Sequence, residues 1–295
     1  MINPGSGDQP GSGNTPSSGD NHGSGDTPGS GDNPGSGIDP IGEAEVTGAA
    51  ALQQYLDGQG ENTAENPYRV KVGGVNLAGT GSGNNLKGLY AALSRYVALD
   101  LSGSYGEKFA NMTAKTAPNK VKITEIILPN GLTSIDVNAF SGCAELVSAD
   151  LGGVTTIPQG AFSGCNKLAT LVMDEVTEII NDGATTNGAF HNCDSLVSVS
   201  LPKASKIGKK SFNSCGSLST VYAPSVAIIE DKAFAGCKSL VSITLGETPP
   251  ALGNDVFAKS KPTAIYVPSS SVNTYKNTDV AGWTEDLKAK VRAIP

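Results

Sequence analysis

A short apolar pattern recurs at nearly regular intervals between residues 135 and 257. Its landmark is Phe-x-x-Cys-x-x-Leu, which occurs five times in full, with cysteine-to-cysteine steps of 22, 28, 22 and 22 residues. A sixth copy keeps Phe257 but lacks the Cys and the Leu. An Ile or Leu stands five residues before most of these phenylalanines. Such self-similarity is typical of repeat architectures. The pattern predicts a 22-residue unit, with six residues inserted in the 28-residue step.

Two apolar residues separated by a single residue follow each landmark Leu. Alternation of this kind predicts a short strand with one face against a core. A Pro follows four of the seven pairs, where its missing N–H would end the strand. The pairs, including one before and one after the full repeats, are Ile126/Leu128, Ala149/Leu151, Leu171/Met173, Val199/Leu201, Val221/Ala223, Ile243/Leu245 and Ile265/Val267.

One strand per 22 residues falls within the period of leucine-rich repeats, and a unit this short cannot bury its own apolar face. Stacking the units solves this problem, because each strand then adds to a parallel sheet at about 4.8 Å per repeat. The predicted fold class is therefore an α/β-type repeat solenoid. We expect a leucine-rich-repeat stack with a parallel sheet on one face, an α/β N-terminal cap and a C-terminal cap.

Composition divides the chain into three predicted parts. Residues 1–41 are rich in Gly, Ser, Asp and Pro, with Ile2 as the only large apolar residue between Met1 and Gly37, so we expect a disordered tether. Residues 42–117 hold no landmark and are expected to form the N-terminal cap region. Residues 118–295 are expected to form the solenoid, with the C-terminal cap starting at about residue 248.

Local patterns predict the elements of the two caps. Apolar spacing predicts helices over 49–56, 86–97 and 284–291, and strands over 68–77 and 98–102, the second of which would join the sheet. Trp283, the only tryptophan, is expected to pack on the last coil, with an exposed ligand platform as the alternative. The polar insertion at 181–188 is either a binding loop or a tolerated surface loop.

The phenylalanines and cysteines are predicted to be structural. Each cysteine occupies the same position in its own repeat, which favours a buried ladder of small apolar side chains over a disulfide framework. Only two histidines are present, so neither a metal site nor a cofactor is expected. The structural ladder comprises Phe140, Phe162, Phe190, Phe212, Phe234, Cys143, Cys165, Cys193, Cys215 and Cys237.

Charge and composition narrow the class of partner. The net charge is −7 and the sequence pI about 4.9, without a Lys or Arg cluster, so nucleic acid is not an expected partner. Charged residues make up only 17%, which favours an exported protein. No apolar run is long enough to span a membrane. Met1 directly precedes a Gly/Ser tract, so we expect that a signal segment has been removed. A monomer is expected.

With these motifs in view, the chain resembles the BspA-type bacterial leucine-rich repeats. The resemblance rests on Ile-x-x-x-Ala-Phe-x-x-Cys-x-x-Leu, as in 229–245, and on the closing Tyr-Val-Pro…Tyr…Gly-Trp run of 266–283. It covers about residues 118–295. It implies a secreted or surface-anchored protein that binds host proteins, other cells or matrix, and it brings no catalytic residue.

The outward positions of the predicted strands are the candidate binding surface. They form rows of mainly small hydroxyl side chains with two tyrosines, a composition that recognition surfaces favour. A solvated sheet that binds nothing also favours β-branched and hydroxyl residues on its outer face, and it is the alternative. The predicted contacts with a protein or glycan partner are Asp150, Val172, Ser200, Tyr222, Thr244 and Tyr266. A passive spacer and an enzyme are the competing functions, and the sequence shows no convergent nucleophile and base for the latter.

Overall fold

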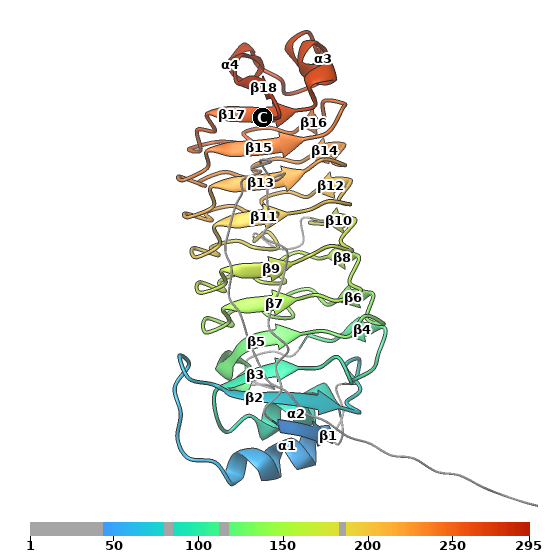
Figure 1. The fold of residues 1–295 in the computed structure, drawn as a ribbon, viewed down its shortest axis with the longest axis vertical. Coiled ribbons are helices and arrows are strands. Elements are labelled where there is room, and N and C mark those ends of the chain that lie inside the picture. Colours follow the sequence, from blue (N-terminus) through green and yellow to red (C-terminus); the bar gives the residue numbers. More distant parts are fainter. Residues whose placement is uncertain (1–43, 80–84, 112–117, 183–186) are drawn as a thin grey trace, which may run out of the picture. The chain divides into compact units, whose positions relative to one another are not determined.

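The computed structural model describes residues 44–79, 85–111, 118–182 and 187–295, all of which belong to one compact unit. The predicted tether at 1–41 lies outside the described residues. Within the unit, successive coils stack along one axis, and every strand pairing is parallel (Figure 1). The predicted leucine-rich-repeat solenoid is therefore confirmed.

The first face of the stack carries one strand per coil. The alternating pairs build these strands, because the apolar residues of each pair point into the core while the residue between them faces outward. Six strands form one sheet: β1 (Ala44–Thr47), β2 (Tyr68–Gly73), β3 (Val97–Asp100), β5 (Ile123–Ile127), β7 (Ser148–Asp150) and β9 (Thr170–Val172). Five form another: β11 (Ser198–Ser200), β13 (Thr220–Ala223), β15 (Ser242–Leu245), β17 (Ala264–Val267) and β18 (Val291–Ala293).

The first face is interrupted between β9 and β11. These neighbouring strands are not paired, and the coil between them carries the insertion. Leu171 in β9 is only half-buried, whereas the equivalent Ala149, Val199 and Val221 are buried. The prediction of one continuous sheet with a buried Leu171 was wrong at this point, because six extra residues disturb the register of a single coil.

A second face carries a sheet that the sequence analysis did not predict. Its seven strands have two residues each: β4 (Lys108–Phe109), β6 (Ser134–Ile135), β8 (Thr156–Ile157), β10 (Glu178–Ile179), β12 (Lys206–Ile207), β14 (Ile228–Ile229) and β16 (Ala251–Leu252). In β6, β8, β12, β14 and β16 the buried residue is the Ile or Leu five residues before a landmark Phe, whereas β10 uses Ile179, eleven residues before Phe190, and β4 uses Phe109. Here β10 pairs with both β8 and β12, so this face stays continuous past the insertion.

The turn that contains the landmark Phe forms a third wall. The buried rings stack from Phe140 to Phe234 with centroids 5.0–5.4 Å apart, and Phe109 and Phe257 extend the column at its two ends. Backbone bonds run alongside: the N–H of Phe190, for example, donates to the carbonyl of Ser211 in the next coil at 2.8 Å. Stacked aromatic rings add to the stabilisation that burial of the side chains provides. Each coil therefore contacts its neighbours on three sides.

Two positions in this turn have left-handed backbone. One lies two residues before the Phe and the other two residues after it. At the second position Gly142, Gly164 and Gly236 have φ of +74° to +78°, but Ser214 adopts φ +62°. Left-handed backbone is unfavourable for residues with a Cβ and nearly free for glycine. Ser214 is therefore strained where the three glycines are not, as are Asn192 at φ +59° and Lys259 at φ +62°.

The N-terminal cap covers the first end of the stack with helices α1 (Gly48–Asp57) and α2 (Leu86–Ala92) and the short 3-10 helix η1 (Pro118–Lys122). The helix predicted to continue to residue 97 ends at Ala92, because Val97 is needed in β3, where it pairs with Tyr68 and Ile123. The strand predicted to reach residue 77 ends at Gly73. The next residue, Gly74, has φ +69°, which an extended strand cannot contain.

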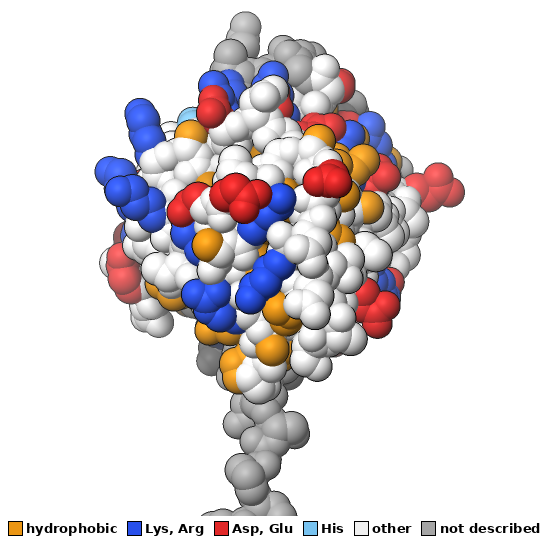
Figure 2. All heavy atoms as spheres, turned by 90° about the horizontal axis from the view of Figure 1, so that it is seen from above, with side chains coloured by type: hydrophobic (Ala, Val, Ile, Leu, Met, Phe, Trp, Pro, Cys, Tyr) orange, Lys and Arg blue, Asp and Glu red, His pale blue; other side chains and the backbone are white. Residues whose placement is uncertain are grey.

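The C-terminal cap consists of η2 (Ser269–Ser271), α3 (Val272–Lys276), α4 (Glu285–Ala289) and β18. The predicted helix stops at Ala289, since Val291 pairs with Ile265 as an added strand. Trp283 is 8% exposed, and its Nε1 donates to the Pro250 carbonyl at 2.8 Å, so it packs on the last coil and is no exposed platform. Seen from this end, the cap shows mixed acidic and basic side chains with only scattered apolar ones (Figure 2).

Ser214 and Gly164 occupy the same left-handed position in two different repeats, and exchanging their residue types tests the strain at Ser214. We expect Ser214→Gly to raise the free energy of unfolding by about 0.5–1 kcal/mol, because the αL penalty exceeds the entropy that glycine adds to the unfolded chain. The matched Gly164→Ser should lower it by a similar amount, since the added Cβ has no atom nearer than 3.9 Å and only the φ of +77° is unfavourable. Chemical denaturation measures both. If both substitutions changed the free energy of unfolding in the same direction, backbone strain at Ser214 would be contradicted.

Candidate binding surface

The outer side of the five-stranded sheet brings four of the six predicted contact residues into one row. Strand pairing places Ser200 beside Tyr222, Tyr222 beside Thr244, and Thr244 beside Tyr266. The row then continues to Arg292 in β18, which the sequence analysis missed because it predicted a helix over 284–291 and no strand after it. We call these five residues the tyrosine row.

The tyrosine row lies on a flat, hydroxyl-rich surface. Tyr222 is 45% exposed, while Ser200, Thr244 and Tyr266 are partly exposed. The Arg292 guanidinium is exposed, and its Nη1 donates to the carbonyls of Ala289 at 2.7 Å and Val291 at 2.9 Å. A neighbouring row on the same sheet presents Ser198, Thr220 and Ser242. The surface therefore offers aromatic area, hydroxyl groups and one cation on a rigid support.

The other two predicted contacts, Asp150 and Val172, lie in the six-stranded sheet and pair with each other. The interruption between β9 and β11 separates them from the tyrosine row. The alternation of the predicted strands would also turn Ser148 and Ala264 outward, because each directly precedes a buried residue of a pair, but both are buried. The predicted surface is thus two surfaces, of which the tyrosine row is the larger.

The insertion is tied down where the structure describes it. Asn181 donates through Nδ2 to the Lys209 carbonyl at 2.9 Å, and Asn187 donates to the Ser163 hydroxyl at 3.3 Å. Residues 183–186 lie outside the described residues. Both alternatives for this loop, binding or tolerance, therefore stay predictions.

The cysteines are part of the stacking. All five are buried and free, and the Sγ atoms of four donate to the Phe carbonyl of the preceding coil at 3.0–3.3 Å. The sixth copy replaces the Cys with Ser260, whose hydroxyl makes the equivalent bond to the Phe234 carbonyl at 2.6 Å. The conserved geometry of these bonds assigns a structural role to the position.

Burial also keeps the thiols protonated. It raises the pKa of Cys143 to about 11 and that of Cys237 to about 12, and it raises the pKa of the other three well above its ordinary value. Thiolate is the reactive form of cysteine, so none of these groups is poised as a nucleophile.

His191, the histidine that lies beside the insertion, is used structurally. Its Nδ1 lies 3.1 Å from the Asn213 carbonyl, which can only accept, so Nδ1 carries the hydrogen. The ring therefore ties its own coil to the next one.

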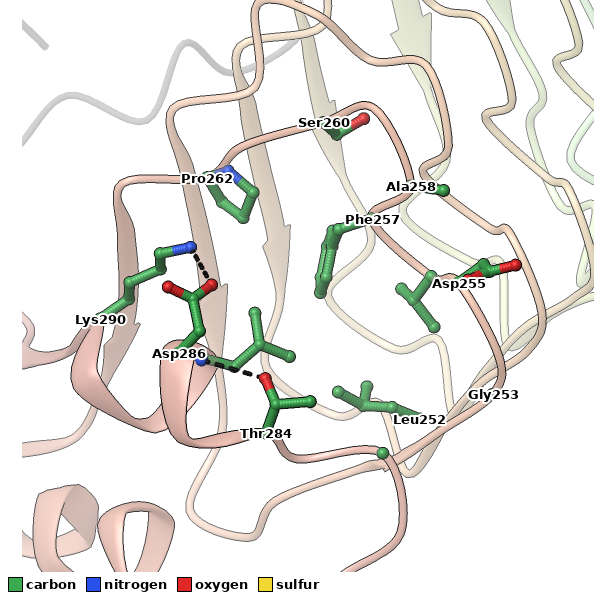
Figure 3. Close-up of a pocket in the computed structure, with 13 residues that line it drawn as sticks. Leu252, Gly253, Asp255, Phe257, Ala258, Ser260, Pro262, Thr284, Asp286 and Lys290 are labelled. Atoms are coloured by element: carbon green, nitrogen blue, oxygen red, sulfur yellow. Dashed lines mark hydrogen bonds and ion pairs between the residues drawn. The ribbon is translucent and has the colours of Figure 1, made fainter.

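A pocket of about 310 Å³ lies where the last coil meets the C-terminal cap (Figure 3). Its polar groups already have partners: Asp286 pairs with Lys290 at 2.6 Å, the Thr284 hydroxyl accepts from the Leu287 N–H at the start of α4, and the Ser260 hydroxyl donates to the Phe234 carbonyl. Ligand sites instead need convergent polar groups that are free to bind. We interpret this pocket as a packing gap at the cap.

Metal and membrane features are not found in the part of the chain that the structure describes. No group of three or more His, Cys, Asp or Glu side chains there is arranged to hold a metal ion. Among the same residues, no helix combines the length and the apolar character that crossing a bilayer requires.

Comparison with known families settles the classification. Residues 114–188 and 184–278 match the family model of the BspA type leucine rich repeat region, in six copies that together span more than half of the chain. The chain belongs to this family. The resemblance noted in the sequence is therefore confirmed. BspA-type leucine-rich repeats are typically involved in protein–protein interaction, and leucine-rich-repeat families are generally non-enzymatic scaffolds.

Solved structures with similar folds include bacterial leucine-rich-repeat proteins. A leucine-rich repeat protein of T. pallidum is 26% identical, and the match covers 63% of this chain and 86% of the T. pallidum chain, with a TM-score of 0.46. A leucine rich cell surface protein of Faecalibacterium prausnitzii is 18% identical over 85% of this chain and 83% of its own, with a TM-score of 0.31. No curated protein matches the sequence.

The buried thiols of these BspA-type repeats predict a specific pH dependence. At about pH 8 a thiol reagent should label the unfolded protein quickly and the folded protein slowly, because the folded thiols remain protonated. The free energy of unfolding should fall as pH rises from about 8.5 towards 11, since the unfolded chain loses thiol protons first. Cys215→Ser keeps the donor and should reduce this slope. Rapid labelling of several thiols in the folded protein would contradict the assignment of buried, protonated thiols.

Proposed function

We propose that the protein is a non-enzymatic recognition module, secreted or displayed at the cell surface, that binds a protein partner through the tyrosine row. The observation that carries the proposal is the register of the five-stranded sheet, which aligns Tyr222, Tyr266 and Arg292 on one rigid face. Tyr and Arg are the residue types enriched among binding hot spots.

The geometry of the row favours a protein over a small ligand. Small molecules are usually enclosed in concave pockets, whereas this face is the outside of a sheet. Tyr222 and Tyr266 are two strands apart, about 10 Å at the usual strand spacing. A flat face of this size suits a partner that also presents a flat or gently curved surface, and the fixed backbone lowers the entropy lost on binding.

The alternatives have less support. An enzyme would need a nucleophile beside a base, and here the thiols are protonated while His191 is bonded to a carbonyl. A passive spacer would need no aligned tyrosines. Surface or secreted localisation fits the low content of charged residues and the BspA-type family.

A double substitution tests the proposal. The protein is screened against host extracellular matrix proteins and bacterial surface proteins, and the affinity of any partner is then measured for Tyr222→Ala with Tyr266→Ala. We expect affinity to fall about 10- to 100-fold, because each hot-spot truncation costs about 1–2 kcal/mol. Stability should change little, since Tyr222 is exposed and Tyr266 is half-exposed.

The control is Ile228→Ala, which removes a 44% exposed apolar side chain from the second sheet. Its affinity should match that of the unmodified protein. Unchanged affinity in the double tyrosine variant, or equal loss in the control, would place the binding surface elsewhere.

A further inference from the structure

A second candidate site lies near the N-terminal end of the stack, away from the five-stranded sheet. It is a hollow of about 710 Å³ formed where the loop between β3 and β4 meets the turn after β5 and the end of β7. That volume lies in the range typical of small-ligand pockets. The residues that give it chemical character are Ser102, Tyr105, Glu107, Asn130 and Asp150. We call it the Tyr105 hollow.

Tyr105 combines an exposed ring with a fixed backbone. Its side chain is 57% exposed, the most exposed large hydrophobic side chain among the described residues. Its N–H donates to the Val75 carbonyl at 3.0 Å, and its carbonyl accepts from the Leu77 N–H at 2.9 Å. The preceding residue, Ser104, is buried and donates to the Val72 carbonyl at 2.8 Å.

Glycines on either side make this anchoring possible. A Cβ on Gly103 would lie 3.2 Å from the Gly73 Cα, and Gly106 has φ +138°, a conformation that side chains rarely adopt. The loop therefore packs tightly against the 73–78 segment while the Tyr105 ring stays in solvent. An exposed aromatic ring held in this way loses little entropy when something stacks on it.

The polar side chains around the ring are largely unused by the fold. The Glu107 carboxylate and the Asn130 side chain are exposed, and neither bonds to a described residue. One oxygen of Asp150 accepts from the Gly152 N–H at 2.9 Å, which fixes the carboxylate and leaves its second oxygen without a partner among the described residues. The hollow thus offers several acceptors, of which the Asp150 carboxylate is fixed in place, and one amide donor.

We propose that the Tyr105 hollow binds a neutral saccharide. The apolar C–H face of a pyranose packs on an aromatic ring, and its hydroxyl groups donate to carboxylate and amide oxygens and accept from an amide. No Lys or Arg lines the hollow, and its two carboxylates repel anions, so uronic, sialylated and sulfated sugars are disfavoured. The site is separate from the tyrosine row and does not depend on the function proposed for it.

A glycan array followed by titration tests the proposal. The labelled full chain is applied, in the presence of a chelator, to neutral glycans of glucose, galactose, mannose and N-acetylhexosamines and to sialylated, uronic and sulfated glycans. We expect binding to neutral glycans alone. For the best of these, measured by calorimetry, Tyr105→Ala should lower affinity about tenfold or more, whereas Tyr105→Phe keeps the ring and should stay within about threefold.

Two further variants make the outcome specific. Glu107→Gln should weaken binding, and Tyr222→Ala with Tyr266→Ala should leave it unchanged, which also separates this site from the protein-binding face. The proposal is overturned if no neutral glycan binds the unmodified chain more strongly than Tyr105→Ala does. Preference for anionic glycans, or loss of binding with chelator, would equally overturn it.

Discussion

Each coil of this protein is completed by its neighbours, and that contact is the constraint on which the structure depends. A 22-residue coil buries one Phe, one Cys and a few aliphatic side chains, each contributing about 1.5–3 kcal/mol. Ordering the backbone costs about 1–2 kcal/mol per residue. A coil alone therefore cannot fold. The Phe column, the thiol–carbonyl bonds and the three parallel sheets supply the missing contacts between coils.

The need of each coil for neighbours also explains the two caps, and it places no demand on the outward-facing side chains. The first and last coils would expose their apolar side, and both caps prevent this by adding strands to the existing sheets, β1–β3 at one end and β18 at the other. At the C-terminal end Tyr275 donates to two loop carbonyls and contacts Trp283 edge-on, which closes the stack. Outward residues such as Tyr222 and Tyr105 carry little of this stability and are available for recognition.

Much of the fold could be predicted from the sequence because its signals are local and repeated. The Phe-x-x-Cys-x-x-Leu landmark and the alternating pairs identify the coils, and Leu52 and Leu56 identify α1. Other features depend on contacts that periodicity does not encode. Val97 and Val291 lie in helical patterns but form strands because a sheet edge is available to each. Two-residue strands such as β10 are too short to show alternation.

The candidate sites show the same limit. The tyrosine row could be predicted as far as Tyr266, because register follows from the repeat, but Arg292 joins it through a strand outside the repeat. The Tyr105 hollow could not be predicted, since the topology brings together a loop, a turn and a strand end from three coils. Glycines flanking Tyr105 were the one local signal, and they become informative only once the neighbouring 73–78 segment is in place.

Hydrogen exchange on a Phe190→Ala variant tests most directly whether contacts between coils hold the fold. Phe190 stacks on Phe162 and Phe212 at 5.3 and 5.1 Å. Its truncation should cost about 3–5 kcal/mol and should lower amide protection in the coils on both sides, including β9 and β13. The exposed Tyr222→Ala in a neighbouring coil should lower protection in neither. Loss of protection confined to the coil of Phe190, with both neighbouring coils unchanged, would contradict the account.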